Sequence, residues 1–423
     1  MDFSRFGQFL SSGSGILTLM DDIDQSLAGP STMHPLGGGN PARIPQVQEI
    51  FRTAMTSLLA DGERFERLTG DYDGSQGDTR FIHNLASLLQ EQYGWNVRPK
   101  NIAITNGSQS SFHSLFHLFA GDFQEGPARR VLLPLAPEYI GYVDVGLGQQ
   151  LFRAFRPSIE LRGDREFKYH IDFERLDVTP DIGAIAVSRP TNPTGNVLTD
   201  TEISHLRELA NANHIPLIID SAYGGPFPNI VFPQVATVWD ENIITCLSLS
   251  KLGLPGLRTG IVIAHEKVIR VVTAANAILS LAPGSAGPGL VSDMVGDRSI
   301  LDLSDNVIRP YYRKRVKQAV SWINTAFEGY PCRVHTPEGA IFLWLWFEGL
   351  PITSEVLYQR LKSRGVLVIA GEHFFPGLEG EWGHRHECIR ISYAQDPASV
   401  EAGIQIIGEE VARAYDNVRR ESA

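Results

Sequence analysis

The stretch Ile243-Ile-Thr-Cys-Leu-Ser-Leu249 runs directly into Ser250-Lys251, so a mainly apolar segment ends abruptly in polar residues. Similar short apolar runs that end in polar residues occur at residues 102–105, 182–187 and 215–219. Apolar runs of this length without alternation are typical of strands that are buried on both faces of a sheet. Because helix-like stretches separate these runs, the sequence predicts an α/β fold: a mostly parallel sheet wrapped by helices. Such sheets bind ligands at the carboxyl ends of their strands.

The last part of the chain has a different order of elements. A long helical pattern covers residues 304–327. It is followed by stretches typical of a strand (340–346), a helix (354–364), two strands (365–369 and 387–393) and a final helix from Pro397. This order predicts a smaller α+β domain. The loop-rich N-terminal part, with Leu36-Gly-Gly-Gly-Asn-Pro41, is expected to join it. We therefore expect a large domain at 46–300 and a small domain formed by 1–45 and 301–423.

Composition and charge exclude several classes of protein. The 423 residues include 37 Lys and Arg against 48 Asp and Glu, a formal net charge of −11, which disfavours nucleic acid and anionic bilayers as partners. The longest apolar run, 340–347, is far shorter than the roughly 20 residues of a membrane-spanning helix. Acidic residues near the N-terminus do not fit a secretion signal, so we expect a cytoplasmic protein. Cys246, Cys332 and Cys388 lie far apart and predict neither a disulfide framework nor a zinc knuckle.

The stretch from Ser248 to Gly260 places Lys251 after a predicted strand, ahead of a Gly/Pro-rich turn and Arg258. Such a lysine can form a Schiff base with an aldehyde, while the arginine and nearby hydroxyls hold a phosphate. Taken alone, the motif is explained more simply by a surface lysine on a turn. The signatures GxGxxG, GxxxxGK[ST], GxSxG and HExxH are absent from the sequence, which weakens dehydrogenase, NTPase, hydrolase and zincin interpretations.

Asp220 closes the apolar run 215–219 and is therefore predicted at the end of a strand. A carboxylate there is costly unless a cation meets it, and a protonated pyridine nitrogen would serve. An aspartate that caps the following turn is an equally good explanation. Tyr223, three residues later, would lie within reach of the same ligand, although a packed tyrosine accounts for it too.

Three further motifs follow predicted strands or begin predicted helices. Asn192-Pro-Thr-Gly195 is first of all a turn, whose Asn192 amide could donate to a phenolate oxygen. Gly107-Ser108-Gln109 begins a helix and would present backbone N–H groups and a hydroxyl to a phosphate, or Ser108 is simply a helix cap. Tyr139, in Pro137-Glu138-Tyr139, could stack on a flat ring or belong to the core.

The order of these motifs along the chain decides between the alternatives. Gly-Ser-Gln, Pro-x-Tyr, Asn-Pro-Thr-Gly, Asp-x-x-Tyr, Ser-x-Ser-Lys with Arg258, and the late Arg390-Ile391-Ser392 resemble, over nearly the whole chain, the class I/II aminotransferases. These are fold-type I enzymes that use pyridoxal 5′-phosphate (PLP). The resemblance implies their large PLP-binding domain, with Lys251 as the Schiff-base lysine and Asp220 paired with the pyridine nitrogen.

The same resemblance implies the remaining contacts to the cofactor. Tyr223 and Asn192 would contact its phenolic oxygen, and Tyr139 would stack on its ring. The group that would hold the phosphate comprises Gly107, Ser108, Gln109, Ser248 and Arg258, although Lys251 and Arg258 are one residue closer than the commonest family spacing. Tyr72 resembles the tyrosine that reaches the phosphate of the neighbouring subunit, which implies a homodimer.

Substrate binding is implied by Arg390, which matches the arginine that grips the α-carboxylate of the amino acid as a bidentate partner. Gly39 matches the glycine whose backbone approaches that carboxylate, with Asn192 beside it. Within the family, the stretches 36–41, 135–142, 188–196 and 337–346 resemble enzymes for aliphatic amino acids. This implies ping-pong transamination between an amino acid of the valine or alanine type and pyruvate or 2-oxoisovalerate.

One other function on the same scaffold stays open at this point, a PLP-dependent C–S β-lyase or decarboxylase. A PLP-sensing regulator is disfavoured. The regulator normally carries a basic DNA-binding domain ahead of the module, and this chain is acidic and begins its Gly39-Asn-Pro motif early. His384 and His386 would share a face if they lay on a strand, as metal ligands could. We expect no metal, because no second ligand cluster accompanies them and PLP chemistry needs none; they would shape the approach to Arg390 or simply form a loop.

Overall fold

The computed structural model describes residues 2–4, 7–9, 17, 33–146 and 151–421. The larger sheet of this part has seven strands, in the spatial order β2-β10-β9-β8-β7-β3-β4. Neighbours from β9 to β4 are parallel, and only β10 is antiparallel to the strands beside it. The strand bounds are β2 Ile102–Thr105, β3 Arg130–Leu133, β4 Phe152–Ala154, β7 Ile182–Ser188, β8 Leu217–Asp220, β9 Ile243–Ser248 and β10 Gly260–Ile263. The predicted mostly parallel sheet is confirmed.

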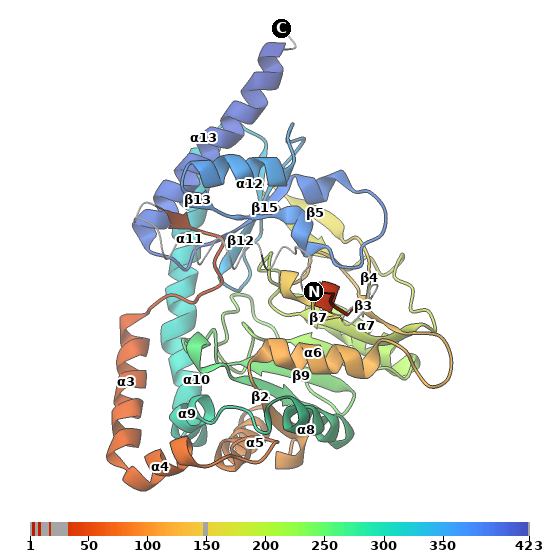
Figure 1. The fold of residues 1–423 in the computed structure, drawn as a ribbon. Coiled ribbons are helices and arrows are strands. Elements are labelled where there is room, and N and C mark those ends of the chain that lie inside the picture. The colour runs from red at the N-terminus through yellow and green to blue at the C-terminus, as the bar shows by residue number, and fades with distance from the viewer. Residues whose placement is uncertain (1, 5–6, 10–16, 18–32, 147–150, 422–423) are drawn as a thin grey trace.

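The strands of this sheet lack alternation because both of their faces are covered. Every residue of β7 and β9 is buried. In Figure 1, α6 crosses the near face of the sheet, and other helices gather around its β2 edge. The helices of this part are α5 Thr79–Tyr93, α6 Ser108–Phe119, α7 Asp200–Ala212, α8 Glu266–Ser280 and α9 Ala286–Gly296.

A second sheet of six strands, β14-β15-β12-β11-β6-β5, lies above the first in Figure 1. It is antiparallel throughout except between β11 and β6. Its strands are β5 Ser158–Arg162, β6 Glu166–His170, β11 Cys332–His335, β12 Phe342–Phe347, β14 Ile369–Ala370 and β15 Cys388–Ser392. The helices α11 Arg309–Ala326, α12 Ser354–Ser363 and α13 Pro397–Glu421 accompany it. The strands and helices expected after residue 300 are therefore present.

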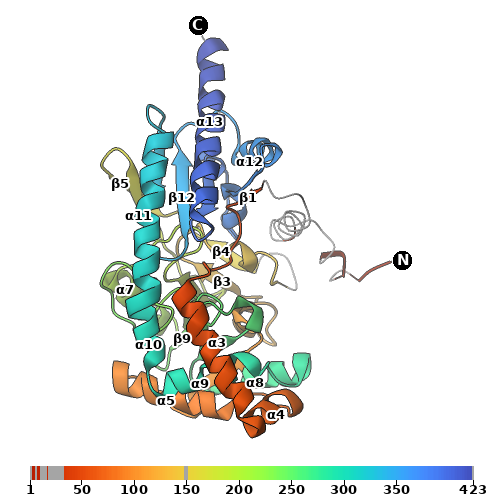
Figure 2. The ribbon, with the colours of Figure 1, turned by 90° about the vertical axis from the view of Figure 1, so that its left-hand side faces the viewer.

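Two features of the structure cross the predicted division into a large domain (46–300) and a small domain (1–45 and 301–423). The β5–β6 hairpin falls within the range 46–300, yet it pairs with β11 of the second sheet. The helical run through α10 (Ser299–Leu303), a π-helical turn (Ser304–Ile308) and α11 crosses residue 300 without a break. Figure 2 shows α11 running from the level of the larger sheet to that of the smaller one. The boundaries at 46 and 300 stay a prediction.

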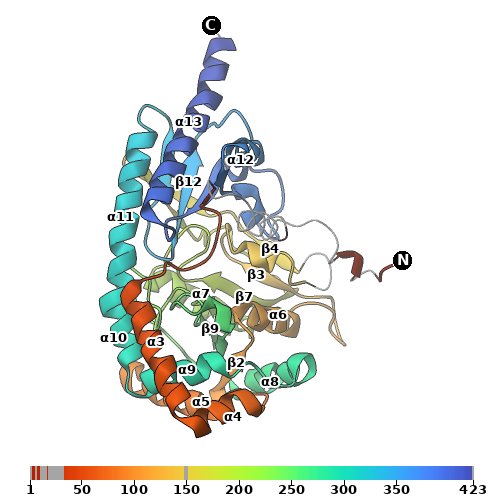
Figure 3. The same ribbon diagram turned by 60° about the vertical axis from the view of Figure 1, so that its left-hand side comes forward.

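The N-terminal part contributes one strand to a third, two-stranded sheet and then a long helix beside the larger sheet. β1 (His34–Pro35) pairs with β13 (Val366–Leu367), and α3 (Pro45–Ala60) then leads away along the larger sheet to α4 (Gly62–Gly70), as Figure 3 shows. Pro45 suits the first turn of α3, where its missing N–H needs no partner. In the ranges that the structure describes, no helix is long and apolar enough to cross a membrane.

Candidate active site

A cavity of about 290 Å³ lies where β7, β8 and β9 end. The predicted site residues that line it are Gly39, Ser108, Gln109, Tyr139, Asn192, Asp220, Tyr223, Ser248, Lys251, Arg258 and Arg390. Residues from distant parts of the sequence thus meet at the carboxyl edge of the sheet, where a ligand was expected. A larger cavity of about 500 Å³, lined by Trp95, Thr237 and Arg309 among others, contains none of the predicted residues.

Lys251 extends from the turn after β9 into this cavity, and its Nζ donates to the backbone oxygen of Gly39 at 2.6 Å. Burial, together with the positive charges of Arg390 and Arg258, lowers the pKa of Lys251 to about 8, while the negative charge of Asp220 opposes the shift. A lysine in this environment supplies the neutral amine that attacks an aldehyde.

The lowered pKa of Lys251 predicts how the cofactor-free protein reacts with an aldehyde. The fraction of neutral amine rises with pH around the pKa of about 8, so the rate of PLP capture should rise through that range and then level off. The measurement is the stopped-flow absorbance change on mixing the cofactor-free protein with PLP at a series of pH values. A rate that keeps rising toward the ordinary lysine pKa of about 10.4 would contradict the effect of burial.

Asp220 is the last residue of β8, and both of its carboxylate oxygens have donors. Oδ1 accepts from the Ala222 N–H at 2.9 Å, and Oδ2 accepts from the Tyr142 hydroxyl at 2.8 Å. Burial raises the pKa of Asp220, whereas these two hydrogen bonds and the nearby Lys251 lower it. The ring of Tyr223 also lies near Lys251, whose Nζ is 5.4 Å from the centre of that ring.

Arg390 on β15 is a buried cation, with 2% of its surface exposed. Its Nη1 donates to Asn192 Oδ1 at 2.7 Å and its Nη2 to the Gly37 oxygen at 2.6 Å, while Nε is buried without a partner among the described residues. Burial lowers the pKa of Arg390 to about 10, so it remains charged at neutral pH. Because a guanidinium only donates, the Asn192 amide oxygen faces it and the amide NH₂ is left to donate elsewhere.

The other end of the cavity combines a helix N-terminus with Arg258. Gly107 precedes α6 with a φ of 90°, and a Cβ there would meet Arg258 Nη2. The positive φ favours glycine, and the absence of a Cβ leaves room for the guanidinium beside the first turn of α6, whose leading N–H groups lack intrahelical acceptors. Arg258 itself adopts a left-handed conformation with a φ of 45° in the shortened turn after Lys251. A helix N-terminus beside an arginine is suited to an anion such as a phosphate.

The remaining residues that were predicted to contact the cofactor differ in their contacts and in whether they line the cavity. Gln109 lines the cavity, but its Nε2 donates to the Gly141 oxygen at 2.7 Å. Ser248 Oγ accepts from the Ser250 N–H at 3.1 Å. Tyr139 lines the cavity and stands edge-on to Tyr142, with 5.3 Å between ring centres. Tyr72 does not line the cavity; it is 82% exposed on the surface.

Two buried residues that the sequence does not single out lie behind Asp220, outside the lining of the cavity. Tyr142 donates to Asp220, and Glu138 is fully buried one position before Tyr139. Both follow β3, a strand that was not predicted, in the segment that carries Tyr139. The rule that polar residues after a buried strand face the ligand would have indicated them if Arg130–Leu133 had been read as a strand.

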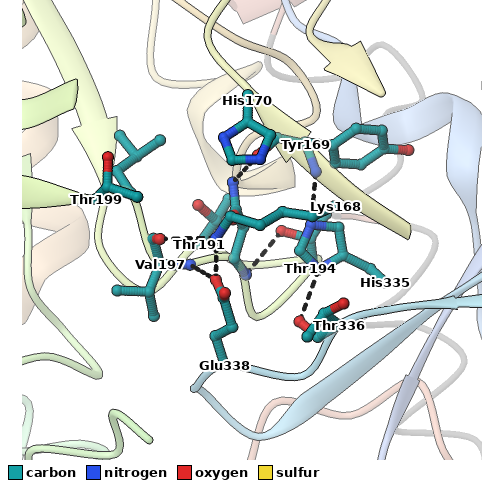
Figure 4. A network of polar contacts seen from close by, with 12 residues as sticks. Lys168, Tyr169, His170, Thr191, Thr194, Val197, Thr199, His335, Thr336 and Glu338 are labelled. Carbon is teal, nitrogen blue, oxygen red and sulfur yellow. Dashed lines mark hydrogen bonds and ion pairs between the residues drawn. The ribbon is translucent and has the colours of Figure 1, made fainter. Parts of the chain in front are cut away.

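The turn that carries Asn192 is fixed by a buried lysine outside the cavity (Figure 4). Lys168 on β6 is 2% exposed; its Nζ donates to Asn196 Oδ1 and the Val197 oxygen, both at 3.0 Å, and forms an ion pair with Glu338. Glu338 also accepts from the Val197 N–H at 3.0 Å. These contacts bind the turn after β7 to the second sheet, so the position of Asn192 depends on both sheets.

Replacing Lys168 by Met should strongly destabilise the protein. The substitution leaves Glu338 with only the more distant Arg162, whose Nη1 is 3.8 Å away, and removes the Lys168 donor from the carbonyl of Val197. Removing one partner of a buried ion pair costs about 3–5 kcal/mol. The free energy of unfolding from denaturant titration measures the loss. The double variant Lys168→Met with Glu338→Leu should recover part of it, whereas an unchanged unfolding midpoint for the single variant would rule out the buried pair.

His384 and His386 lie in a short 3₁₀ helix, Gly383–His386, and not on a strand as the metal interpretation required. His384 Nε2 contacts the Tyr169 hydroxyl, which also accepts from Trp344 Nε1 at 3.0 Å, and His386 Nδ1 lies 2.5 Å from Glu372. Neither histidine lines the cavity. Throughout the described ranges, no group of three or more His, Cys, Asp or Glu residues is arranged to hold a metal ion.

Comparison with known proteins agrees with this geometry. Residues 46–407 match the model of the family "Aminotransferase class I and II". The chain is 51% identical over 415 residues to the valine–pyruvate aminotransferase of Escherichia coli K12, covering 98% of this chain and 99% of that protein.

Two solved structures are similar over nearly their whole length. The valine-pyruvate aminotransferase of Salmonella typhimurium LT2 superposes with a TM-score of 0.88 at 50% identity, covering 95% of this chain and 99% of that one. A putative amino-acid aminotransferase from Psychrobacter arcticum 273-4 has a TM-score of 0.96 at 46% identity, covering 99% and 100% of the two chains.

The chain belongs to the class I and II aminotransferases. It is a PLP-dependent aminotransferase, and its fold is the fold-type I architecture of its structural neighbours. The residues of the cavity fit the cofactor: a buried amine with a lowered pKa suits the aldehyde, a carboxylate suits the ring nitrogen, and the helix N-terminus with Arg258 suits the phosphate.

Proposed function

We propose that the protein transfers an amino group from an aliphatic L-amino acid of the valine or alanine type to a 2-oxo acid, pyruvate or 2-oxoisovalerate, in a ping-pong cycle. The observation that carries the substrate class is the distribution of cations in the cavity. In its described lining, the lysine and arginine side chains are Lys251, Arg258 and Arg390. These three serve the aldehyde, the phosphate and one carboxylate, and none is left for a second carboxylate.

The contacts already described support the residue roles in this proposal. When bound, PLP supplies an aldehyde that takes up the amino group and a ring that accepts electrons from the substrate's α-carbon. Lys251, with its lowered pKa, takes and returns the proton at that carbon. Asp220 would keep the ring nitrogen protonated, and the free amide N–H of Asn192 and the hydroxyl of Tyr223 would meet the phenolic oxygen. Arg390 orients the substrate through its α-carboxylate.

The relatives support the proposed substrates. The proteins from Escherichia coli and Salmonella typhimurium that match at 51% and 50% identity are named valine–pyruvate aminotransferases. Apolar and aromatic side chains near the three cations, such as Ile140, Pro190 and Tyr223, suit an aliphatic substrate side chain. A β-lyase is not favoured by these matches.

The test is an assay of the purified PLP-loaded protein with a panel of amino donors and either pyruvate or 2-oxoisovalerate as acceptor. Formation of alanine from pyruvate together with 2-oxoisovalerate from valine is expected. Preference for aspartate or glutamate as donor would contradict the aliphatic substrate class. Release of ammonia and pyruvate from a cysteine conjugate, without amino transfer, would indicate the lyase instead.

Replacing Arg390 by Lys should impair substrate binding specifically. A point charge cannot reproduce the planar fork that meets a carboxylate, and losing a charged hydrogen bond of about 1.5–3 kcal/mol predicts a fall in kcat/KM of about 10- to 100-fold. Steady-state kinetics with valine should show most of this as a higher KM, with the visible absorbance of the cofactor unchanged. The exposed control Arg313→Lys should behave as the parent. An unchanged kcat/KM in Arg390→Lys would show that Arg390 does not bind the α-carboxylate of the substrate.

We also propose that the protein is a cytoplasmic homodimer. Large apolar side chains are exposed near the anion-binding end of the cavity: Tyr72 is 82%, Ile278 84%, Leu279 67% and Leu281 64% exposed. Hydrogen bonds from Asn276 to Ser75 and from Asn106 to Ser280 bring their segments together. Exposed apolar surface of this kind is typical of an interface, and the three buried free cysteines suit a reducing compartment. Sedimentation of the holoprotein as a monomer would contradict the dimer.

A further inference from the structure

Behind Asp220 lies a chain of hydrogen-bonding side chains that leads away from the cavity to a second buried carboxyl group. The Tyr142 hydroxyl donates to Asp220 Oδ2 at 2.8 Å and lies 3.5 Å from Ser188 Oγ. Ser188 Oγ in turn lies 2.6 Å from Glu138 Oε2. Glu138, Ser188 and Tyr142 are all buried, at 0%, 3% and 1% exposure. Two carboxyl groups are therefore joined through two hydroxyls, and only Asp220 lines the cavity.

Glu138 has hydrogen-bond donors but no cation. Its oxygens also meet the backbone N–H groups of Ser188 at 2.8 Å and Tyr139 at 3.2 Å. None of the ion pairs among the described residues involves Glu138. Burial raises the pKa of Glu138 to about 8, and the negative charge of Asp220 contributes in the same direction. Two unpaired negative charges joined by two hydroxyls in a buried site are unfavourable, so one of the two carboxyl groups should hold a proton.

We propose that Tyr142 and Glu138 are positioning residues for Asp220: Tyr142 fixes one oxygen of the carboxylate, and Glu138 is held as the neutral acid so that Asp220 carries the only negative charge behind the cavity. With a proton on Glu138, the hydroxyl hydrogens of Glu138, Ser188 and Tyr142 can all point along the chain toward Asp220. The protonated ring nitrogen that Asp220 would meet in the cavity would then favour ionisation of Asp220 over that of Glu138. This inference rests on the role proposed above for Asp220.

The variant Tyr142→Phe removes only the hydroxyl that donates to Asp220. Loss of a hydrogen bond to a charged group predicts a 10- to 100-fold lower kcat, with KM for valine nearly unchanged. The pH titration of the visible absorbance of the PLP-loaded protein should shift as well. In an Asp220→Ala background, Tyr142→Phe should have almost no further effect on the single-turnover rate, because Tyr142 acts through Asp220. An equal loss in both backgrounds would show a merely structural role and overturn the proposal.

Glu138→Gln tests the neutral acid directly. A glutamine keeps an N–H toward Ser188 and an oxygen for the Ser188 N–H, at the expense of the weaker contact from Tyr139, so kcat should stay within a few-fold of the parent. The infrared difference spectrum between the PLP-loaded parent and this variant should contain the carbonyl stretch of one protonated carboxyl group. Absence of that band, or a loss of kcat as large as in Tyr142→Phe, would overturn the assignment.

These outcomes are separable from failure of the proposed function. If the parent transfers no amino group from any donor, the proposed function is wrong, and the infrared band still reports whether Glu138 is protonated. If the parent is active and Tyr142→Phe keeps the parent's kcat and titration, only the positioning role is wrong. Thermal unfolding of each variant identifies a loss of activity that comes from loss of the fold.

Discussion

Lys251→Ala should lose the visible absorption of the PLP-loaded protein, and its transamination rate should fall on the order of 10⁴-fold, the upper end of what a positioned proton-transfer group contributes. Lys251 is the amine in the cavity with a pKa lowered to about 8, and its Nζ lies close to both Gly39 and Tyr223. The substitution removes the covalent attachment and the base together. Absorbance spectra before and after borohydride, with single-turnover kinetics, measure both losses.

The exposed Lys267 on α8 provides the matched control for this experiment. Lys267→Ala should remain yellow and active, because its side chain lies on the surface. A Lys251→Ala protein that stays yellow and can still be reduced by borohydride would refute the assignment of the attachment site.

Asp220→Ala should slow proton removal from the substrate by about 10²- to 10³-fold, the usual loss when a preorganised electrostatic partner is removed from an active site. Binding of the cofactor should change much less, because Lys251, Arg258 and the first turn of α6 are untouched. Single-turnover kinetics with valine measures the first effect, and titration of the cofactor-free protein with PLP measures the second.

The exposed Asp122 offers a control for Asp220→Ala, since Asp122→Ala changes the net charge equally without touching the cavity. Turnover of Asp220→Ala close to that of the parent would show that the carboxylate does not act on the ring nitrogen. Loss of cofactor binding as large as the loss of rate would give Asp220 a binding role instead.

The sequence allowed the central sheet to be predicted because each of its strands is a local signal. β7 and β9 are buried along their whole length, and the residues that follow them change abruptly to polar. The same change of character located Asp220 and Lys251, since the carboxyl ends of neighbouring parallel strands meet at one edge. Asn192, Tyr139 and Arg390 also line the predicted cavity. The roles of these residues needed the family resemblance in addition to the pattern.

What could not be predicted depends on contacts between distant segments. The β5–β6 hairpin pairs through β6 with β11, so Val334 lies opposite Glu166, and nothing in the local pattern of either segment indicates this partner. Lys168 lies on that hairpin, so its contacts with the turn that carries Asn192 could not be predicted either. Glu138 and Tyr142 follow a strand that went unrecognised, and their connection through Ser188 exists only in three dimensions.

The central claim is that the cofactor is held covalently by one buried lysine with Asp220 behind its ring. Its most direct test is borohydride reduction of the PLP-loaded protein, followed by proteolysis and mass spectrometry of the labelled peptide. The account predicts one phosphopyridoxyl group per chain, on Lys251. Labelling of another lysine, or no labelled peptide from protein that carries PLP, would contradict it.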